Sequence, residues 1–99
     1  MAQFLCVLRP CRPTLAQDAT EAELAIIGQH FEHLQVRHSE GRLHVAGRTE
    51  GGEIGVIIFD AADAHDASGF IARDPAVVEG LMTPSVYPFR LALSSAPDG

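Results

Sequence analysis

Residues 42–59 form the stretch RLHVAGRTEGGEIGVIIF, which decides the fold. Its first part alternates apolar and polar residues, as in a strand with one covered face, and is expected to end at Gly47. Residues 50–53 are a turn between two strand-like runs, so a β-hairpin is predicted. Residues 54–59 are nearly all apolar, which predicts a central strand. The segments on either side of this hairpin then determine which sheet it joins.

The chain before the hairpin predicts one strand and one helix. Residues 4–8 are a continuous apolar run, suited to a central strand. Thr20 and Glu23 have the spacing of a capping box, in which each side chain bonds to the backbone of the other residue. A helix is therefore expected from this box to about residue 38 or 39, with Gly41 close to its C-terminal cap. The apolar residues of this helix recur at spacings of three and four and form one stripe: Leu24, Ile27, Phe31 and Leu34.

The chain after the hairpin predicts a second helix and a last strand. Residues 60–73 are rich in alanine with apolar residues at helical spacing. Asp74 and Pro75 suit the N-cap and the first position of a further short helix through Glu79. Residues 86–93 predict the last strand. The order strand, helix, strand, strand, helix, strand is typical of the ferredoxin-like βαββαβ arrangement, an α+β fold with a four-stranded antiparallel sheet and two helices on one face.

The predicted strands carry apolar residues on both faces, which indicates a partner. Two helices cover only one face of the sheet, and the other face in water would be a large apolar patch. A homodimer that packs sheet against sheet is therefore predicted. A chain of 99 residues makes one domain, expected over residues 1–93, with residues 94–99 as a flexible C-terminal tail.

Charge and composition limit the classes of partner. The net charge of −6 and the pI near 5.1 argue against nucleic-acid binding. The basic residues are all arginines, which suit contacts to carboxylates, and Arg9, Arg42 and Arg48 are candidates for holding a small anionic ligand. No apolar stretch has the length of a membrane span and no signal peptide is recognised, so a cytoplasmic protein is expected. Cys6 and Cys11 are expected to remain unbridged.

The candidate catalytic residues are His30 and Asp74. An imidazole and a carboxylate are the commonest parts of a proton-transfer device near neutral pH. Helical geometry places His30 on the flank of the apolar stripe, half-buried, and His33 further round toward water. The structural alternatives are a boundary histidine and a helix cap. The cap is compatible with catalysis, because a capping carboxylate can also fix the tautomer of a neighbouring imidazole.

Metal and cofactor chemistry are weaker alternatives. His30 and His33 could chelate a metal from adjacent helical turns, but no Cys, Asp or Glu stands at an obvious third position. A haem- or oxygen-dependent enzyme with His30 as axial ligand is a further alternative, which a visible spectrum of the purified protein would test. The prediction is that no metal and no cofactor is needed.

Several short segments together resemble the YciI-like (YCII-related) family over roughly residues 3–91. They are HFEHL followed by GRLHVAG, then ARDP, and finally VYPF, at residues 30–34, 41–47, 72–75 and 86–89. The resemblance implies a ferredoxin-like domain that dimerises into an α+β barrel. It also implies a site centred on a His/Asp pair, which corresponds to His30 and Asp74. Ala76 and Arg48 depart from the family pattern, which often has an aromatic residue and a proline at these positions.

The resemblance also suggests a reaction class, since some relatives are linked to the breakdown of chlorinated aromatic compounds by elimination. The leading hypothesis is a small-molecule enzyme in which His30, oriented by Asp74, abstracts a proton next to a carbonyl. The result would be isomerisation, elimination or dehydrochlorination without a cofactor. The alternative hypothesis is a non-catalytic accessory protein of the same fold that binds a small metabolite.

Overall fold

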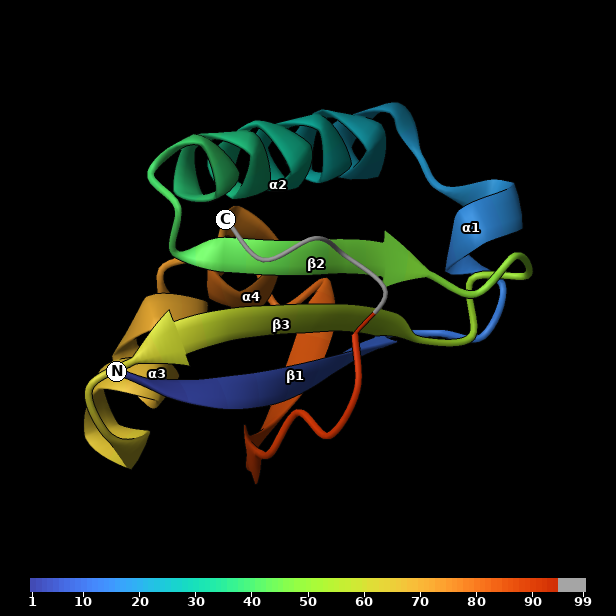
Figure 1. The fold of residues 1–99 in the computed structure, drawn as a ribbon. Helices are drawn as coiled ribbons and strands as arrows, with labels where there is room; N and C mark the ends of the chain where they lie inside the picture. Colours follow the sequence, from blue (N-terminus) through green and yellow to red (C-terminus); the bar gives the residue numbers. More distant parts are fainter. Residues whose placement is uncertain (95–99) are drawn as a thin grey trace.

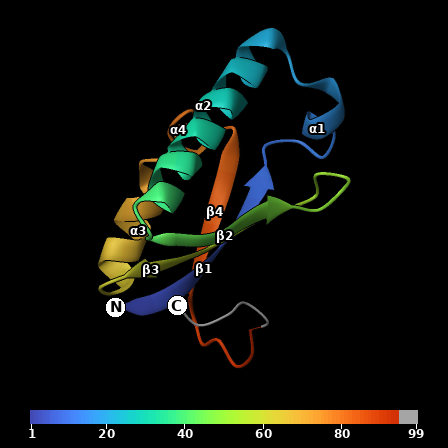
Figure 2. The same ribbon diagram turned by 45° about the horizontal axis from the view of Figure 1, so that its top comes forward.

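The computed structural model describes residues 1–94 and shows an α+β fold with one four-stranded antiparallel sheet (Figure 1). The strand order is β2-β3-β1-β4. Figure 2 shows α2, α3 and α4 together on one side of this sheet. The ferredoxin-like prediction is confirmed. In chain order the elements are β1 (Ala2–Pro10), α1 (Leu15–Asp18), α2 (Glu21–Ser39), β2 (Leu43–Arg48), β3 (Gly55–Ala61), α3 (Ala64–Ala72), α4 (Pro75–Val78) and β4 (Met82–Phe89).

The boundaries of several elements differ from those predicted. Gly47 does not end its strand, because it pairs with Val56 on β3 and β2 continues to Arg48. The last strand was placed four residues too late and is β4, Met82–Phe89. Pro84 lies before the predicted start of this strand, and β4 is an edge strand, where the missing N–H of a proline is tolerated. The helix predicted from residue 60 begins instead at residue 64, and the short helix α1 was not predicted.

The predicted capping box starts α2 and is joined by an arginine. The Glu23 N–H donates to Thr20 Oγ1 at 3.2 Å, and the Thr20 N–H donates to Glu23 Oε1 at 2.9 Å. Arg12 donates to both oxygens of the same carboxylate, at 2.7 and 2.8 Å. These bonds from Arg12 are the main reason that the pKa of Glu23 falls to about 2. Arg12 thereby ties the loop after β1 to the first turn of α2.

The core lies between the sheet and α3. Alternate residues of β1 and β3 are buried on this face, among them Cys6 and Ile57, as a strand period of two requires. Phe59 stacks on Phe70 of α3 with ring centroids 4.5 Å apart. The guanidinium of Arg42 lies over the ring of Phe70, 4.5 Å from its centroid. The helix–sheet packing therefore holds β3 and the start of β2 firmly.

The apolar stripe of α2 is not packed into this core. Leu34 is buried, but Leu24 and Phe31 are 56% and 60% exposed. Helix α2 contacts α4 and β2, and only its second half closes onto the sheet. The first half stands away from the strands (Figure 2). A cavity lies between this half of the helix and the strands.

The opposite face of the sheet carries no helix among residues 1–94. The strand register places Val45, Ile58, Leu5 and Tyr87 side by side, so that one apolar row crosses all four strands. Val45 and Tyr87 are half-exposed. The chain from residue 90 to residue 94 has no regular structure, and residues 95–99 of the predicted tail lie outside the described residues. No helix among the described residues is long and apolar enough to cross a membrane.

Candidate active site

His30 and Asp74 are in direct contact. Nδ1 of His30 lies 2.7 Å from each carboxylate oxygen of Asp74, although 44 residues separate them in the chain. The His30 side chain is 13% exposed and that of Asp74 only 2%. An imidazole Nδ1 this close to a carboxylate carries the proton and donates it, which leaves Nε2 unprotonated in the neutral ring. The two residues that were selected from the sequence are therefore one hydrogen-bonded unit.

Asp74 is held in place by its role as N-cap of α4. Its Oδ1 accepts the N–H of Ala76 at 2.9 Å, and Pro75 occupies the first turn. Ala76 is fully buried against Leu15 and Leu81, and it does not line the cavity described below. The alanine that departs from the family pattern is thus part of the packing beneath Asp74. Asp74 therefore caps α4 and contacts His30 at the same time.

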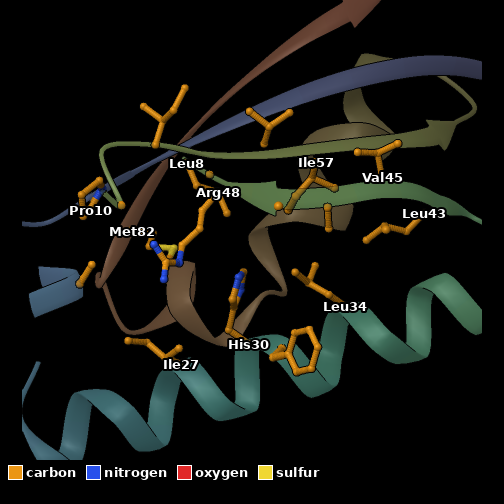
Figure 3. Close-up of a pocket in the computed structure, with 18 of the residues that line it drawn as sticks. Leu8, Pro10, Ile27, His30, Leu34, Leu43, Val45, Arg48, Ile57 and Met82 are labelled. Atoms are coloured by element: carbon orange, nitrogen blue, oxygen red, sulfur yellow. The ribbon is translucent and has the colours of Figure 1, made fainter. Parts of the chain in front are cut away.

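The imidazole of His30 lies on the wall of a cavity of about 850 Å³ (Figure 3). The cavity occupies the hollow between α2 and the strands, with α1 at one end. Its walls are mostly apolar and include Leu8, Ile27, Phe31, Ile57 and Met82. Its polar lining consists of His30, Gln35, His38, His44 and Arg48. Figure 3 shows the side chains of His30 and Arg48 entering this space from opposite walls, α2 and β2.

Of the three arginines that were candidates for holding an anion, Arg48 lines the cavity, whereas Arg9 and Arg42 do not. Arg42 is engaged elsewhere: Nη2 donates to Asp66 at 2.7 Å and Nε to the backbone carbonyl of Asp60 at 2.8 Å. Arg9 is exposed on β1 and does not line the cavity. Arg48 does line it. Sequence reasoning gave no ground for choosing among the three, because only the fold of the hairpin brings Arg48 to the cavity.

Two neighbours of the pair have shifted pKa values. Burial raises the pKa of the Cys6 thiol to about 12, and the charge of Asp74 adds to the effect. Cys6 is therefore a packing residue and not a nucleophile. Burial lowers the pKa of His33, an effect that Asp74 opposes and Arg37 reinforces. His33 was expected to face water but is partly buried, because α2 leans on α4 along that side.

The remaining histidines and cysteines add no metal centre in the part of the chain that the structure describes. No group of three or more His, Cys, Asp or Glu side chains is placed to hold a metal ion within residues 1–94. His44 is instead paired with Asp60 at 2.8 Å at the sheet edge. Cys6 and Cys11 are both free thiols. His38 and His44 were not expected in the site, and the helical and strand patterns around them carry no signal for it.

Comparison with known proteins shows which family the chain belongs to and which solved structures resemble it. The model of the YCII-related domain family matches residues 2–90. No curated protein matches the chain by sequence.

Both solved structures belong to enzymes that act on small molecules. One is the 5-chloro-2-hydroxyhydroquinone dehydrochlorinase of Burkholderia phenoliruptrix in complex with 2,5-dihydroxybenzoquinone, with a TM-score of 0.67 and 17% identity over 90% of this chain and 95% of that one. The other is a muconolactone isomerase, with a TM-score of 0.68 and 18% identity over 97% of each chain. At this identity, the likeness establishes a shared fold.

Proposed function

This chain belongs to the YCII-related domain family, and from that premise we propose that it is a small-molecule enzyme in which His30 and Asp74 perform general acid–base catalysis. The observation that carries the proposal is the 2.7 Å contact between Nδ1 of His30 and the carboxylate of Asp74, on the wall of a cavity. The fold it shares with a dehydrochlorinase and an isomerase supports the choice of reaction class.

The geometry gives each residue a separate task. Because Nδ1 donates to Asp74, Nε2 is the nitrogen available to a molecule in the cavity. A proton taken up by Nε2 makes an imidazolium, which the adjacent carboxylate stabilises and holds in orientation. The side chains of His30 and Asp74 are 13% and 2% exposed, and this burial strengthens the charge interaction between them. His30 is thus the proposed catalytic residue and Asp74 the proposed positioning residue.

Two outcomes can follow from abstraction of a proton next to a carbonyl. In an isomerisation, the electron pair of the broken C–H bond shifts into a conjugated enolate, and the imidazolium returns the proton to a different carbon. In an elimination, the same electron pair forms a C=C bond as chloride leaves with its bonding electrons. Neither route uses an oxidant or a reductant. Both routes need one group that accepts a proton and a second group that keeps the first in orientation. His30 and Asp74 can provide these two functions.

Muconolactone and 5-chloro-2-hydroxyhydroquinone are the first compounds to assay in deuterated buffer. We expect the wild-type protein to incorporate deuterium into the lactone, or to release chloride from the chlorinated compound, faster than buffer alone. Proton and deuterium NMR and a chloride electrode measure the two reactions. Saturable binding without exchange, chloride release or any other conversion would contradict catalysis and favour the metabolite-binding alternative.

The functional unit is proposed to be a homodimer that uses the uncovered sheet face. The apolar row that crosses the four strands supports this, because it would otherwise be exposed to water. We expect size-exclusion chromatography with light scattering to give twice the 10.6 kDa mass of one chain. Ile58→Glu, at the centre of the row, should shift the mass to that of a monomer, whereas Val78→Glu on exposed α4 should not. A wild-type protein with the mass of a single chain would contradict the dimer.

A further inference from the structure

The cavity wall contains an arginine and no carboxylate among the described residues, although the protein as a whole is acidic. The chain has 13 Asp and Glu residues and a net charge of −6. Within residues 1–94, none of these carboxylates lines the cavity, and Asp74 lies behind His30 rather than in the wall. The guanidinium of Arg48 is the permanently charged group of this wall, and its other ionisable groups are the imidazoles of His30, His38 and His44. Of these imidazoles, His30 and His44 are hydrogen-bonded to the carboxylates of Asp74 and Asp60. A cavity of this composition favours a ligand with negative charge.

The guanidinium of Arg48 is fixed by its own hairpin. Nη1 donates to the carbonyl of Thr49 at 3.1 Å and to that of Glu50 at 3.0 Å. The turn itself is held by Gln17 of α1, whose side-chain amide donates to the Gly51 carbonyl at 3.1 Å. The arginine is therefore oriented before a ligand arrives, which reduces the entropy cost of binding.

Gly52 makes room for this arrangement. Its φ of +77° lies in the left-handed region, and a Cβ there would stand 2.5 Å from Cβ of Ala16 and 3.7 Å from Nη1 of Arg48. The absence of a side chain lets the turn approach α1 closely while the guanidinium stays at the cavity. The hairpin, α1 and Arg48 therefore form one end of the cavity.

One edge of the guanidinium remains available. With Nη1 bound to the hairpin carbonyls, Nε and Nη2 of Arg48 have no hydrogen-bond acceptor among the described residues. These two N–H groups point the same way and match the two oxygens of a carboxylate, which accepts such a fork through parallel hydrogen bonds. The opposite wall of the cavity presents the imidazole of His30 (Figure 3).

We propose that the cavity selects small organic carboxylates, and that Arg48 is the specificity-determining residue that binds their anionic group. The inference rests on the proposed function in taking this cavity as the substrate site. The carboxylate would pair with Nε and Nη2 of Arg48, and the apolar body of the ligand would lie against the walls between Arg48 and His30. The substrate would thereby be anchored at one end and presented to the imidazole at the other.

Benzoate and benzamide test this proposal because they share a shape and differ in charge. Their dissociation constants are measured by NMR titration of wild-type protein and of R48Q, R48K and R73Q. Arg73 is an exposed arginine outside the cavity and serves as the matched control. We expect wild-type protein to bind benzoate at least about tenfold more tightly than benzamide, as a charge-assisted hydrogen bond allows. R48Q should abolish the preference, R48K should keep part of it, and R73Q should keep it.

Two results would overturn the proposal. One is an intact preference in R48Q, and the other is wild-type protein that fails to bind benzoate or to distinguish it from benzamide. The outcome is separate from that of the catalytic assay. A benzoate preference that depends on Arg48 in a protein without turnover would defeat the proposed reaction but not the anion site. Turnover together with an intact benzoate preference in R48Q would support the proposed reaction and defeat the anion site.

Discussion

The substitution His30→Gln is expected to lower the rate of deuterium incorporation or chloride release by about 10²–10⁴-fold, the usual contribution of a general acid–base group. Glutamine keeps a polar side chain of similar length at this position of α2 but cannot accept and return a proton. Substrate binding should change little by comparison, so the loss should be seen in kcat more than in KM. Steady-state kinetics of the two proteins on the same substrate provide the measurement.

His33→Gln is the control for this substitution. His33 lies one turn further along α2 and is partly buried, but it does not line the cavity. Its replacement should leave the rate within about twofold of wild type, a difference of less than 0.5 kcal/mol in the barrier. Equal losses in the two variants would show that the effect comes from disturbance of α2. Full turnover in His30→Gln would remove His30 from the mechanism.

The substitution Asp74→Ala is expected to lower the free energy of unfolding by about 2–4 kcal/mol. Loss of an N-cap typically costs about 1 kcal/mol. Loss of the hydrogen bond between a buried carboxylate and His30 adds about 1.5–3 kcal/mol. The burial of Asp74 supports the upper part of this range, since its side chain is only 2% exposed and its removal also leaves a gap beneath α4.

Asp63→Ala separates these two contributions. Asp63 is the exposed N-cap of α3 and accepts the N–H of Asp66 at 2.8 Å, without a histidine partner. Urea denaturation should therefore show a loss of about 1 kcal/mol for Asp63→Ala. Asp74→Asn, which retains a good N-cap, should fall between wild type and Asp74→Ala. Equal losses in Asp74→Ala and Asp63→Ala would mean that the contact with His30 adds nothing to stability.

Much of the architecture could be predicted because it is encoded locally. The capping box at Thr20, the turn at residues 50–53 and the Asp74–Pro75 step each define an element by short-range chemistry, and all three have that role in the structure. Their order along the chain then selects the ferredoxin-like arrangement. The errors lie where tertiary pairing overrides local preference. β4 contains Pro84 and Pro88, and only its position at the sheet edge lets it pair with β1.

The candidate site depends on contacts that no local pattern contains. His30 and Asp74 meet because α2 packs against α4. Their residue types and the family resemblance pointed to this pair, but no local pattern places the two side chains together. The hollow under α2 could not be predicted, since the stripe that includes Leu24 and Phe31 has the spacing of a buried helix face. The same holds for Arg48, whose place at the cavity results from the bulged strand β2 and the turn that follows it.

The tautomer of His30 tests the central claim most directly, because the mechanism requires Asp74 to hold the proton on Nδ1 and to leave Nε2 as the base. Long-range ¹H–¹⁵N NMR at a pH of about 9, well above the ordinary imidazole pKa of about 6.5, assigns the proton in each neutral ring. The account predicts a protonated Nδ1 and an unprotonated Nε2 for His30 in wild-type protein. A proton on Nε2 with an unprotonated Nδ1 would contradict it.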